Sequence, residues 1–108
     1  MKKTFGSIIL GLCLFLMLFG TASAQVGSLT GAVVNQQNHP IPGLTVYLVH
    51  PEVGRSDPSI TDNSGRFYFY NVPLRNSPYY IEIYWGKDLI YRNSIPISGN
   101  ENIRDIRL

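Results

Sequence analysis

The chain has 108 residues, of which 44% are hydrophobic and 15% charged, and its formal net charge is +2. This length suits a single domain, and one cysteine cannot form an internal disulfide, which excludes a disulfide-stabilised mini-protein. Two of the nine basic residues, Lys2 and Lys3, lie at the N-terminus, so residues 25–108 carry seven basic and seven acidic side chains. A neutral domain lacks the basic surface that binds nucleic acid, and we predict no nucleic-acid partner.

The N-terminus has the three parts of a secretory signal peptide. Two lysines form a basic start, residues 8–19 form a short apolar run, and the small residues Thr-Ala-Ser-Ala follow it. Basic start, apolar run and small-residue cleavage site are typical of an exported precursor. We therefore predict a signal peptide over residues 1–24, with cleavage between Ala24 and Gln25, which leaves residues 25–108 as one domain.

The apolar run also bears on where the protein resides. About a dozen apolar residues are fewer than the roughly 20 that cross a bilayer, which argues against the alternative of an uncleaved membrane anchor. Cys13 lies inside the run, away from the position that a lipoprotein cysteine occupies at the cleavage point. Export without cysteines fits a bacterial periplasm or cell exterior. We expect a secreted or periplasmic protein of the bacterial cell envelope, with no membrane span after cleavage.

The remainder of the chain has the pattern of short β-strands. Segments rich in β-branched and aromatic residues alternate with Gly, Pro, Asn and Asp clusters, and no stretch shows sustained helical periodicity. The expected strands are residues 28–35, 44–49, 59–61, 66–70, 79–85, 89–97 and 102–108. Seven short strands separated by such turns predict an all-β fold, a seven-stranded antiparallel Greek-key β-sandwich.

Two turn motifs separate these strands. Pro40 and Pro42 precede Gly43, and proline cannot donate to a strand ladder, so both prolines belong outside the strands. Asp62 begins an Asp-x-x-Gly turn that ends at Gly65. We expect positive φ at both glycines, and we expect the Asp62 carboxylate to accept a hydrogen bond from a backbone N–H two residues on.

The motifs also occur in a distinctive order. The chain carries Gly-x-Val at residues 31–33, Pro-x-Pro-Gly-x-x-Val-x-Leu at 40–48, Thr-Asp-x-x-Gly-x-Phe-x-Phe-x-x-Val-Pro at 61–73 and Tyr-x-Ile-x-Ile at 79–83. This ordered set resembles the carboxypeptidase regulatory-like domain family. The resemblance implies a transthyretin-like (prealbumin-like) sandwich that acts as a non-catalytic accessory or binding module. The loop at residues 75–78 departs from the family pattern, which usually has Pro-x-Gly there, so the role of this loop stays open.

One tetrapeptide suggests an enzyme. Tyr-Arg-Asn-Ser at residues 91–94 is similar to the Tyr-Arg-Gly-Ser that ends hydroxyisourate hydrolase, which shares the transthyretin-like fold. In that enzyme the tetrapeptide closes the chain and histidines converge on the site, whereas here fourteen residues follow it. His39 and His50 flank a strand and lie beside prolines in expected loops. We predict no enzyme and no catalytic residues, with a solvated Arg92 in a strand and the hydrolase as a remote alternative.

Metal binding and covalent cross-linking are also unexpected. Asp57, Asp62 and Asp88 lie in separate turns, whereas calcium requires several oxygens from one compact loop. The two histidines have no carboxylate between them in the sequence, so we predict no metal site and no cofactor. A self-forming isopeptide bond, as in similar-looking surface adhesin repeats, requires a lysine in the first strand. Lys87, in a turn, is the only lysine of residues 25–108.

Aromatic side chains are the remaining candidates for a functional surface. Successive side chains of a strand point to opposite faces of the sheet, an alternation here called parity. Parity places four aromatic residues inside the sandwich: Phe67, Phe69, Tyr79 and Trp85. It places five tyrosines outside: Tyr47, Tyr68, Tyr70, Tyr80 and Tyr84. On one shared face, such rings would suit stacking against a sugar or docking of a protein, with Arg66, Arg75 and Arg92 as rim residues. The alternative is that the tyrosines form cross-strand pairs that only stabilise a sheet.

These observations predict an exported, non-catalytic β-sandwich module that binds an unknown protein or carbohydrate partner at the cell envelope. The alternative from another class is a structural or assembly subunit that uses exposed strand edges. The last expected strand, which ends at Leu108, is the candidate edge. The sequence leaves the ligand and the oligomeric state open.

Overall fold

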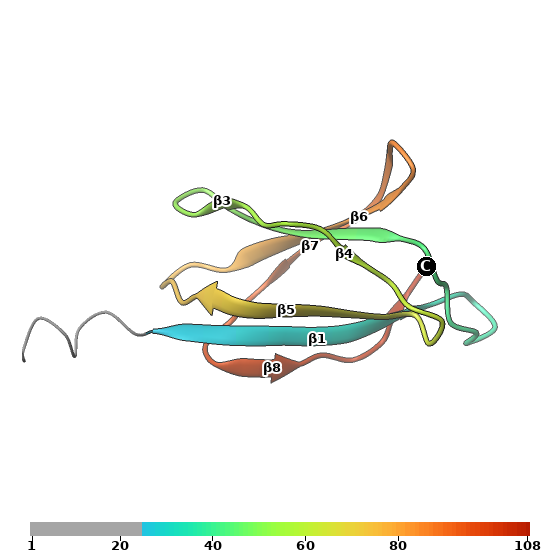
Figure 1. Ribbon diagram of the computed structural model, residues 1–108, viewed down its shortest axis with the longest axis horizontal. Coiled ribbons are helices and arrows are strands. Elements are labelled where there is room, and N and C mark those ends of the chain that lie inside the picture. Colours follow the sequence, from blue (N-terminus) through green and yellow to red (C-terminus); the bar gives the residue numbers. More distant parts are fainter. Residues whose placement is uncertain (1–24) are drawn as a thin grey trace, which may run out of the picture.

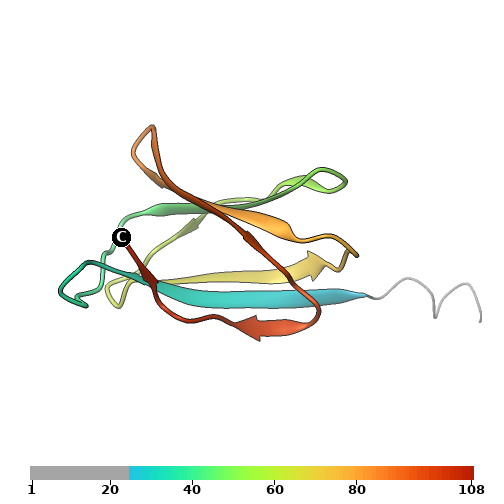
Figure 2. The same cartoon turned by 180° about the vertical axis from the view of Figure 1, so that it is seen from behind.

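The computed structural model describes residues 25–108, and the predicted signal peptide, including Ala24 of the predicted cleavage site, lies outside this range. These residues form two packed β-sheets, and no helix occurs among them (Figures 1 and 2). The strands are β1 (Val26–Val34), β2 (Thr45–His50), β3 (Gly54–Arg55), β4 (Ser59–Ile60), β5 (Arg66–Pro73), β6 (Tyr79–Trp85), β7 (Asp88–Ile95), β8 (Asn100–Asn102) and β9 (Ile106–Arg107). The all-β, two-sheet class predicted from the sequence is confirmed.

Each sheet has a central strand that holds its neighbours. In the first sheet the order is β5-β1-β8, and β9 also pairs with β1. In the second sheet the order is β3-β2-β6-β7, and β4 also pairs with β2. The short strand β3 lies within the region expected to be a loop, and it pairs with the end of β2.

The C-terminal segment departs from the prediction. Residues 102–108 were expected to form one antiparallel strand, but β8 and β9 are two short strands that both run parallel to β1. Just after β8, the backbone N–H of Ile103 still donates to the Thr30 carbonyl oxygen at 3.0 Å. A Cβ on Gly31 would lie 2.8 Å from Cγ1 of Ile103, so the side chain of Ile103 packs in the space that a larger residue at position 31 would need. Pairing with β1 then resumes at β9.

The core follows the two-residue period of the strands. Phe67 and Ile83 are completely buried and Tyr79 is buried, as parity predicted, and Leu29 of β1 is completely buried as well. Trp85 was also expected inside, but its side chain is 60% exposed. The end of the β6–β7 hairpin bends away from the first sheet (Figures 1 and 2), which leaves the end of β6 outside the core.

Both predicted turns have the expected geometry. Gly43 and Gly65 have φ values of 78° and 73°. Oδ1 of Asp62 accepts hydrogen bonds from the backbone N–H groups of Ser64 and Arg66, each at 2.9 Å. These bonds fix the hairpin that leads into β5.

The two glycines should differ in how well they tolerate a methyl group. A Cβ on Gly65 would lie 2.5 Å from the carbonyl oxygen of Val33, whereas nothing lies within 4 Å of a Cβ on Gly43. We expect Gly43→Ala to lower the free energy of unfolding by about 1 kcal/mol through backbone strain alone. Gly65→Ala should lower it by more than about 2 kcal/mol, because the clash with backbone adds to this strain. Denaturant unfolding followed by circular dichroism measures both, and equal losses would contradict the packing described here.

A second prediction concerns alkaline pH. Burial raises the pKa of the Tyr79 hydroxyl above its ordinary value, and the nearby Arg75 charge offsets part of this rise. The unfolded chain therefore loses this proton at a lower pH than the folded chain, and stability falls as pH rises through about 10. Tyr79→Phe should make this fall shallower, although it also removes the hydrogen bond that the hydroxyl donates to the Pro73 carbonyl oxygen. Denaturant unfolding between about pH 9 and 11 tests this, with Tyr70→Phe as the exposed control; an unchanged slope would contradict it.

Candidate binding surfaces

The five outward tyrosines do not share one face. Tyr68 and Tyr70 lie on β5 in the first sheet, whereas Tyr47, Tyr80 and Tyr84 lie on β2 and β6 in the second sheet. Since the sheets pack with their inner faces together, the two groups lie on opposite outer faces of the sandwich. The single tyrosine surface that was considered from parity is therefore wrong. The tyrosines form two separate surfaces, and different residues surround them on each.

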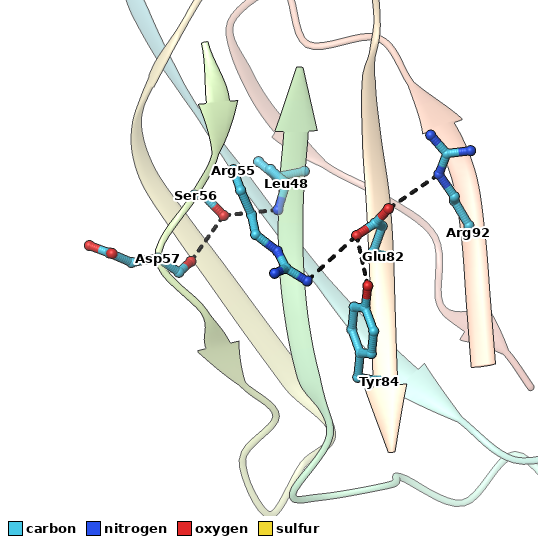
Figure 3. A network of polar contacts seen from close by, with 7 residues as sticks. All are labelled: Leu48, Arg55, Ser56, Asp57, Glu82, Tyr84 and Arg92. Atoms are coloured by element: carbon cyan, nitrogen blue, oxygen red, sulfur yellow. Dashed lines mark hydrogen bonds and ion pairs between the residues drawn. The ribbon is translucent and has the colours of Figure 1, made fainter. Parts of the chain in front are cut away.

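In the second sheet, the outer face is an arginine–tyrosine network. We call this surface the arginine–tyrosine face; its residues are Tyr47, Arg55, Tyr80, Glu82, Tyr84 and Arg92. Glu82 lies at its centre, where Oε2 is 3.3 Å from Nε of Arg92 and Oε1 is 3.9 Å from a terminal nitrogen of Arg55 (Figure 3). The Tyr84 hydroxyl donates to the same Oε1 at 3.2 Å. One carboxylate thus connects three strands of the sheet.

The arginines also cover the tyrosine rings. The guanidinium carbon of Arg55 lies 3.8 Å from the ring centroid of Tyr47, and that of Arg92 lies 4.3 Å from the centroid of Tyr80. Tyr47 and Tyr84 meet edge to face with centroids 5.7 Å apart. Such pairs stabilise a sheet, and they leave fewer ring surfaces for a ligand. The geometry of these three tyrosines fits the structural alternative stated above.

Serine, threonine and asparagine surround the tyrosines of the first sheet instead. We call this surface the tyrosine–asparagine face; its residues are Ser28, Thr30, Tyr68, Tyr70, Asn100 and Asn102. Thr30 on β1 lies directly between Tyr68 on β5 and Asn102 on β8. Two residues earlier on β1, Ser28 pairs with Asn100 of β8. On the β5 side, Ser28 faces a bulge that contains Tyr70 and Asn71, and Asn71 has a φ of 54°. The face therefore repeats one arrangement twice: an aromatic ring, a hydroxyl and an amide.

The polar groups of this face are ordered by hydrogen bonds. The Ser28 hydroxyl donates to Oδ1 of Asn100 at 3.1 Å, and the Thr30 hydroxyl donates to Oδ1 of Asn102 at 3.2 Å. Because both amide oxygens accept within the face, both Nδ2 groups keep donors for another molecule. None of the six side chains is charged. These hydroxyls and amides were not predicted from the sequence, although their two-residue spacing, at 28 and 30 and at 100 and 102, is the signal that they share a face.

The two rings are exposed and aligned. Tyr70 is 70% exposed and Tyr68 is 39% exposed. Their planes differ by only 8° and their centroids are 6.3 Å apart. Arg66, one of the expected rim residues, is beside this face, with its guanidinium carbon 6.0 Å from the Tyr68 centroid. Arg92 belongs to the other face, and Arg75 lies in the loop between β5 and β6.

A serine–histidine pair also occurs, and its geometry argues against catalysis. His50 was expected in a loop, but it ends β2 and is only 1% exposed. Its Nδ1 accepts the backbone N–H of Glu52 at 3.0 Å, and its Nε2 lies 2.8 Å from Oγ of Ser77. In neutral histidine, an accepting Nδ1 places the proton on Nε2, which therefore donates to the serine. A general base needs the opposite arrangement, with Nε2 free to take the serine proton.

The tetrapeptide at residues 91–94 does not form a catalytic cluster either. Arg92 is bound by Glu82, and Tyr91 packs partly against the core. In the part of the chain that the structure describes, no three His, Cys, Asp or Glu side chains gather where a metal ion could bind. Residues 25–108 also contain no helix long and apolar enough to cross a membrane.

Comparison with known proteins yields structural likeness only. No protein-family model and no curated protein sequence matches the chain. The fold is similar to BcpA, the major pilin subunit of Bacillus cereus (TM-score 0.60, 14% identity, covering 77% of this chain and 29% of the pilin). It is also similar to the Bacillus anthracis TIE protein (0.55, 13%, covering 76% and 16%). A third match is the dioxygenase domain of a carbohydrate-binding fusion protein from Streptomyces sp. SirexAA-E (0.59, 12%, covering 80% and 82%).

These matches show the fold and leave the function open. The chain spans less than a third of the length of the pilin and of TIE. An enzyme domain and a pilin subunit share this sandwich at very low identity, and one fold serves many functions. The evidence for function therefore lies in the chemistry of the two surfaces.

The arginine–tyrosine face generates a third prediction. Glu82→Gln removes the charge between two arginines that are about half exposed, with side-chain exposures of 50% and 51%. Solvent screening limits such pairs, so we expect the free energy of unfolding to fall by only about 0.5–1 kcal/mol. The difference should shrink at high salt. Glu52→Gln, which changes an exposed carboxylate outside this network, is the control in denaturant unfolding, and equal effects of the two changes would contradict the assignment.

Proposed function

We propose that residues 25–108 form an exported, non-catalytic module that binds an uncharged glycan at the cell envelope through the tyrosine–asparagine face. The observation that carries this proposal is the composition of that face. Two exposed, nearly parallel tyrosine rings lie beside hydroxyl and amide groups, with no charge among the six residues. The opposite face has three tyrosine rings, but arginines lie over all of them.

The chemistry of this face matches that of a sugar. A pyranose ring has an apolar face of C–H groups that stacks on an aromatic ring, and its hydroxyls donate and accept hydrogen bonds around the edge. Tyrosine contributes stacking area and a polar end at a low cost in conformational entropy. The two free amide donors of Asn100 and Asn102 suit hydroxyl acceptors. The six residues of the face offer no cation to an anionic ligand, and Arg66 lies at one end, 6.0 Å from the Tyr68 centroid.

Other observations support export and a binding role. The N-terminal sequence has the pattern of a signal peptide cleaved between Ala24 and Gln25. We infer secretion or periplasmic retention in a bacterial envelope from this pattern. The ordered motifs support membership of the carboxypeptidase regulatory-like family, with the transthyretin-like sandwich that this resemblance implies. The serine–histidine geometry supports a non-catalytic role.

An assembly subunit is the second candidate, and strand edges are the observation that favours it. The expected edge was the last strand, but β9 is two residues long and pairs with β1. The long edge strand is instead β7, of eight residues, which borders the second sheet and is exposed over most of its length. An unpaired edge of this length presents N–H and C=O groups to a partner strand.

Calorimetric titration of neutral oligosaccharides into the protein tests the glycan proposal. We expect Tyr68→Ala and Tyr70→Ala each to weaken binding about tenfold, because each removes one stacking platform. Asn102→Ala should weaken it less. Tyr80→Ala, an equivalent truncation on the arginine–tyrosine face, is the matched control and should retain full affinity.

Two results would overturn this assignment. One is the absence of binding across gluco-, xylo-, manno- and chito-oligosaccharides. The other is a loss of affinity in Tyr80→Ala equal to the loss in Tyr70→Ala, which would place the ligand on the other sheet.

A further inference from the structure

The tyrosine–asparagine face repeats along its strands. Its first row across the sheet consists of Tyr68 on β5, Thr30 on β1 and Asn102 on β8. Two residues along the strands, a second row repeats the same three kinds of side chain: Tyr70, Ser28 and Asn100. In each row the hydroxyl of β1 donates to the amide oxygen of β8, at 3.2 Å and 3.1 Å. The face therefore consists of two equivalent rows.

The distance between the rows is the repeat of a strand. Residues two apart on a strand are separated by about 6.6 Å, and the ring centroids of Tyr68 and Tyr70 are 6.3 Å apart. The two rings also keep nearly the same orientation, with planes only 8° apart, so the bulge at Asn71 does not disturb the repeat. A ligand that contacts both rows in the same way must itself repeat along the strands at a distance of this size. One sugar unit of an extended glycan is of comparable length.

The repeat ends after these two rows. Beyond the first row, Ala32 pairs with Arg66, which places a buried methyl group and a charge where the hydroxyl and the ring would be. Beyond the second row, Val26 pairs with Pro73, and neither side chain can form a hydrogen bond. Along β1, residues 25–108 therefore contain no third row of this composition. The face offers contacts to two consecutive units of a ligand.

The middle of each row carries the shortest side chain. Thr30 and Ser28 lie on β1, whereas the tyrosines of β5 and the asparagines of β8 lie on either side, about 10 Å apart across the sheet. A chain that follows β1 would therefore meet one ring and one amide donor at each row. The ring would contact the C–H groups of a sugar unit, and Nδ2 of the asparagine would donate to an oxygen at the edge of that unit.

We infer that this face binds an extended glycan with equatorial 1,4-links, whose chain runs along β1 and places two consecutive sugar units on the two rows. This inference rests on the proposed glycan binding and names the class of glycan. Equatorial bonds at C1 and C4 leave a pyranose ring in opposite directions, so the chain is a straight, flat ribbon. Successive units are turned over, but both faces of each ring carry C–H groups and both edges carry oxygen atoms, so the two rows meet the same chemistry. An axial bond at C1 makes the chain turn, and the next unit then misses the second row.

Tetrasaccharides that differ in their links test the class of glycan. The probes for calorimetric titration are cello-, xylo-, manno- and chitotetraose, with maltotetraose as the α-1,4-linked isomer of cellotetraose. We expect at least one of the four ribbon-like probes to bind at least about tenfold more tightly than maltotetraose, which can place only one unit on the face. Within the series that binds, the disaccharide should exceed the monosaccharide by a similar factor, because its second unit fills the second row.

The outcomes separate this inference from the proposed function. Equal or tighter binding of maltotetraose, or a monosaccharide that binds as tightly as its disaccharide, would overturn the ribbon-like ligand and leave glycan binding intact. Absence of binding by all five tetrasaccharides would overturn both.

Paired substitutions test the direction of the chain. Tyr70→Ala removes the ring of the second row, so the sugar unit on that row has already lost much of its contact. Asn100→Ala in the same row should then weaken binding less than it does in the wild type, whereas Asn102→Ala in the first row should keep its full effect. Further losses of equal size would place the chain across the strands and contradict the inference. Circular dichroism of each variant checks that the sheets are intact, and Tyr80→Ala remains the matched control.

Discussion

The pairing of β1 on both of its edges is the constraint on which the rest of the structure depends. β5 pairs with one edge, and β8 and β9 pair with the other. The inward side chains Leu29 and Val33 are completely buried. The outward side chains Ser28 and Thr30 hold the two asparagines of β8. Because successive side chains point to opposite faces, the strand that fills the core also sets the spacing of the polar groups on the surface.

The local sequence pattern was sufficient to predict much of this architecture. The two-residue period correctly placed Phe67, Phe69, Ile81 and Tyr79 inside, since burial of alternate side chains is a property of each strand by itself. The turn at Asp62 depended only on residues within the turn. These features need no knowledge of which strand lies beside which.

The features that the sequence analysis missed all depend on strand partners. Parity indicates that Tyr68 and Tyr84 point outward, but it does not indicate that they belong to different sheets. Trp85 has the parity of a buried residue, yet it is 60% exposed at the end of β6, where the hairpin bends away from the first sheet. The parallel direction of β8 follows from the return of the chain from the second sheet to the first, a long-range connection with no local signal. His50 is buried because Ser77 and Tyr79, far along the chain, close over it.

The two outer faces show how neighbours determine what a tyrosine does. On the second sheet, Arg55 and Arg92 lie against the rings and Glu82 fixes both guanidinium groups, so the aromatic surface serves the sheet itself. On the first sheet, the cross-strand residues are too short to cover a ring, and Arg66 lies 6.0 Å from the Tyr68 centroid, farther than Arg55 lies from Tyr47. Serine, threonine and asparagine reach each other and leave the tyrosines exposed. The same residue type thus has two roles, and the difference lies in the length and charge of the cross-strand partner.

The size of the tyrosine–asparagine face limits how tightly one copy of the proposed module can hold a glycan. Two rings and two amides form a small contact, and a small contact with a flexible glycan is weak because the ligand loses conformational freedom on binding. A polysaccharide presents many equivalent units, so each unit that is released lies at a high effective concentration near the same face. The small face therefore suits a long polysaccharide better than a short free sugar.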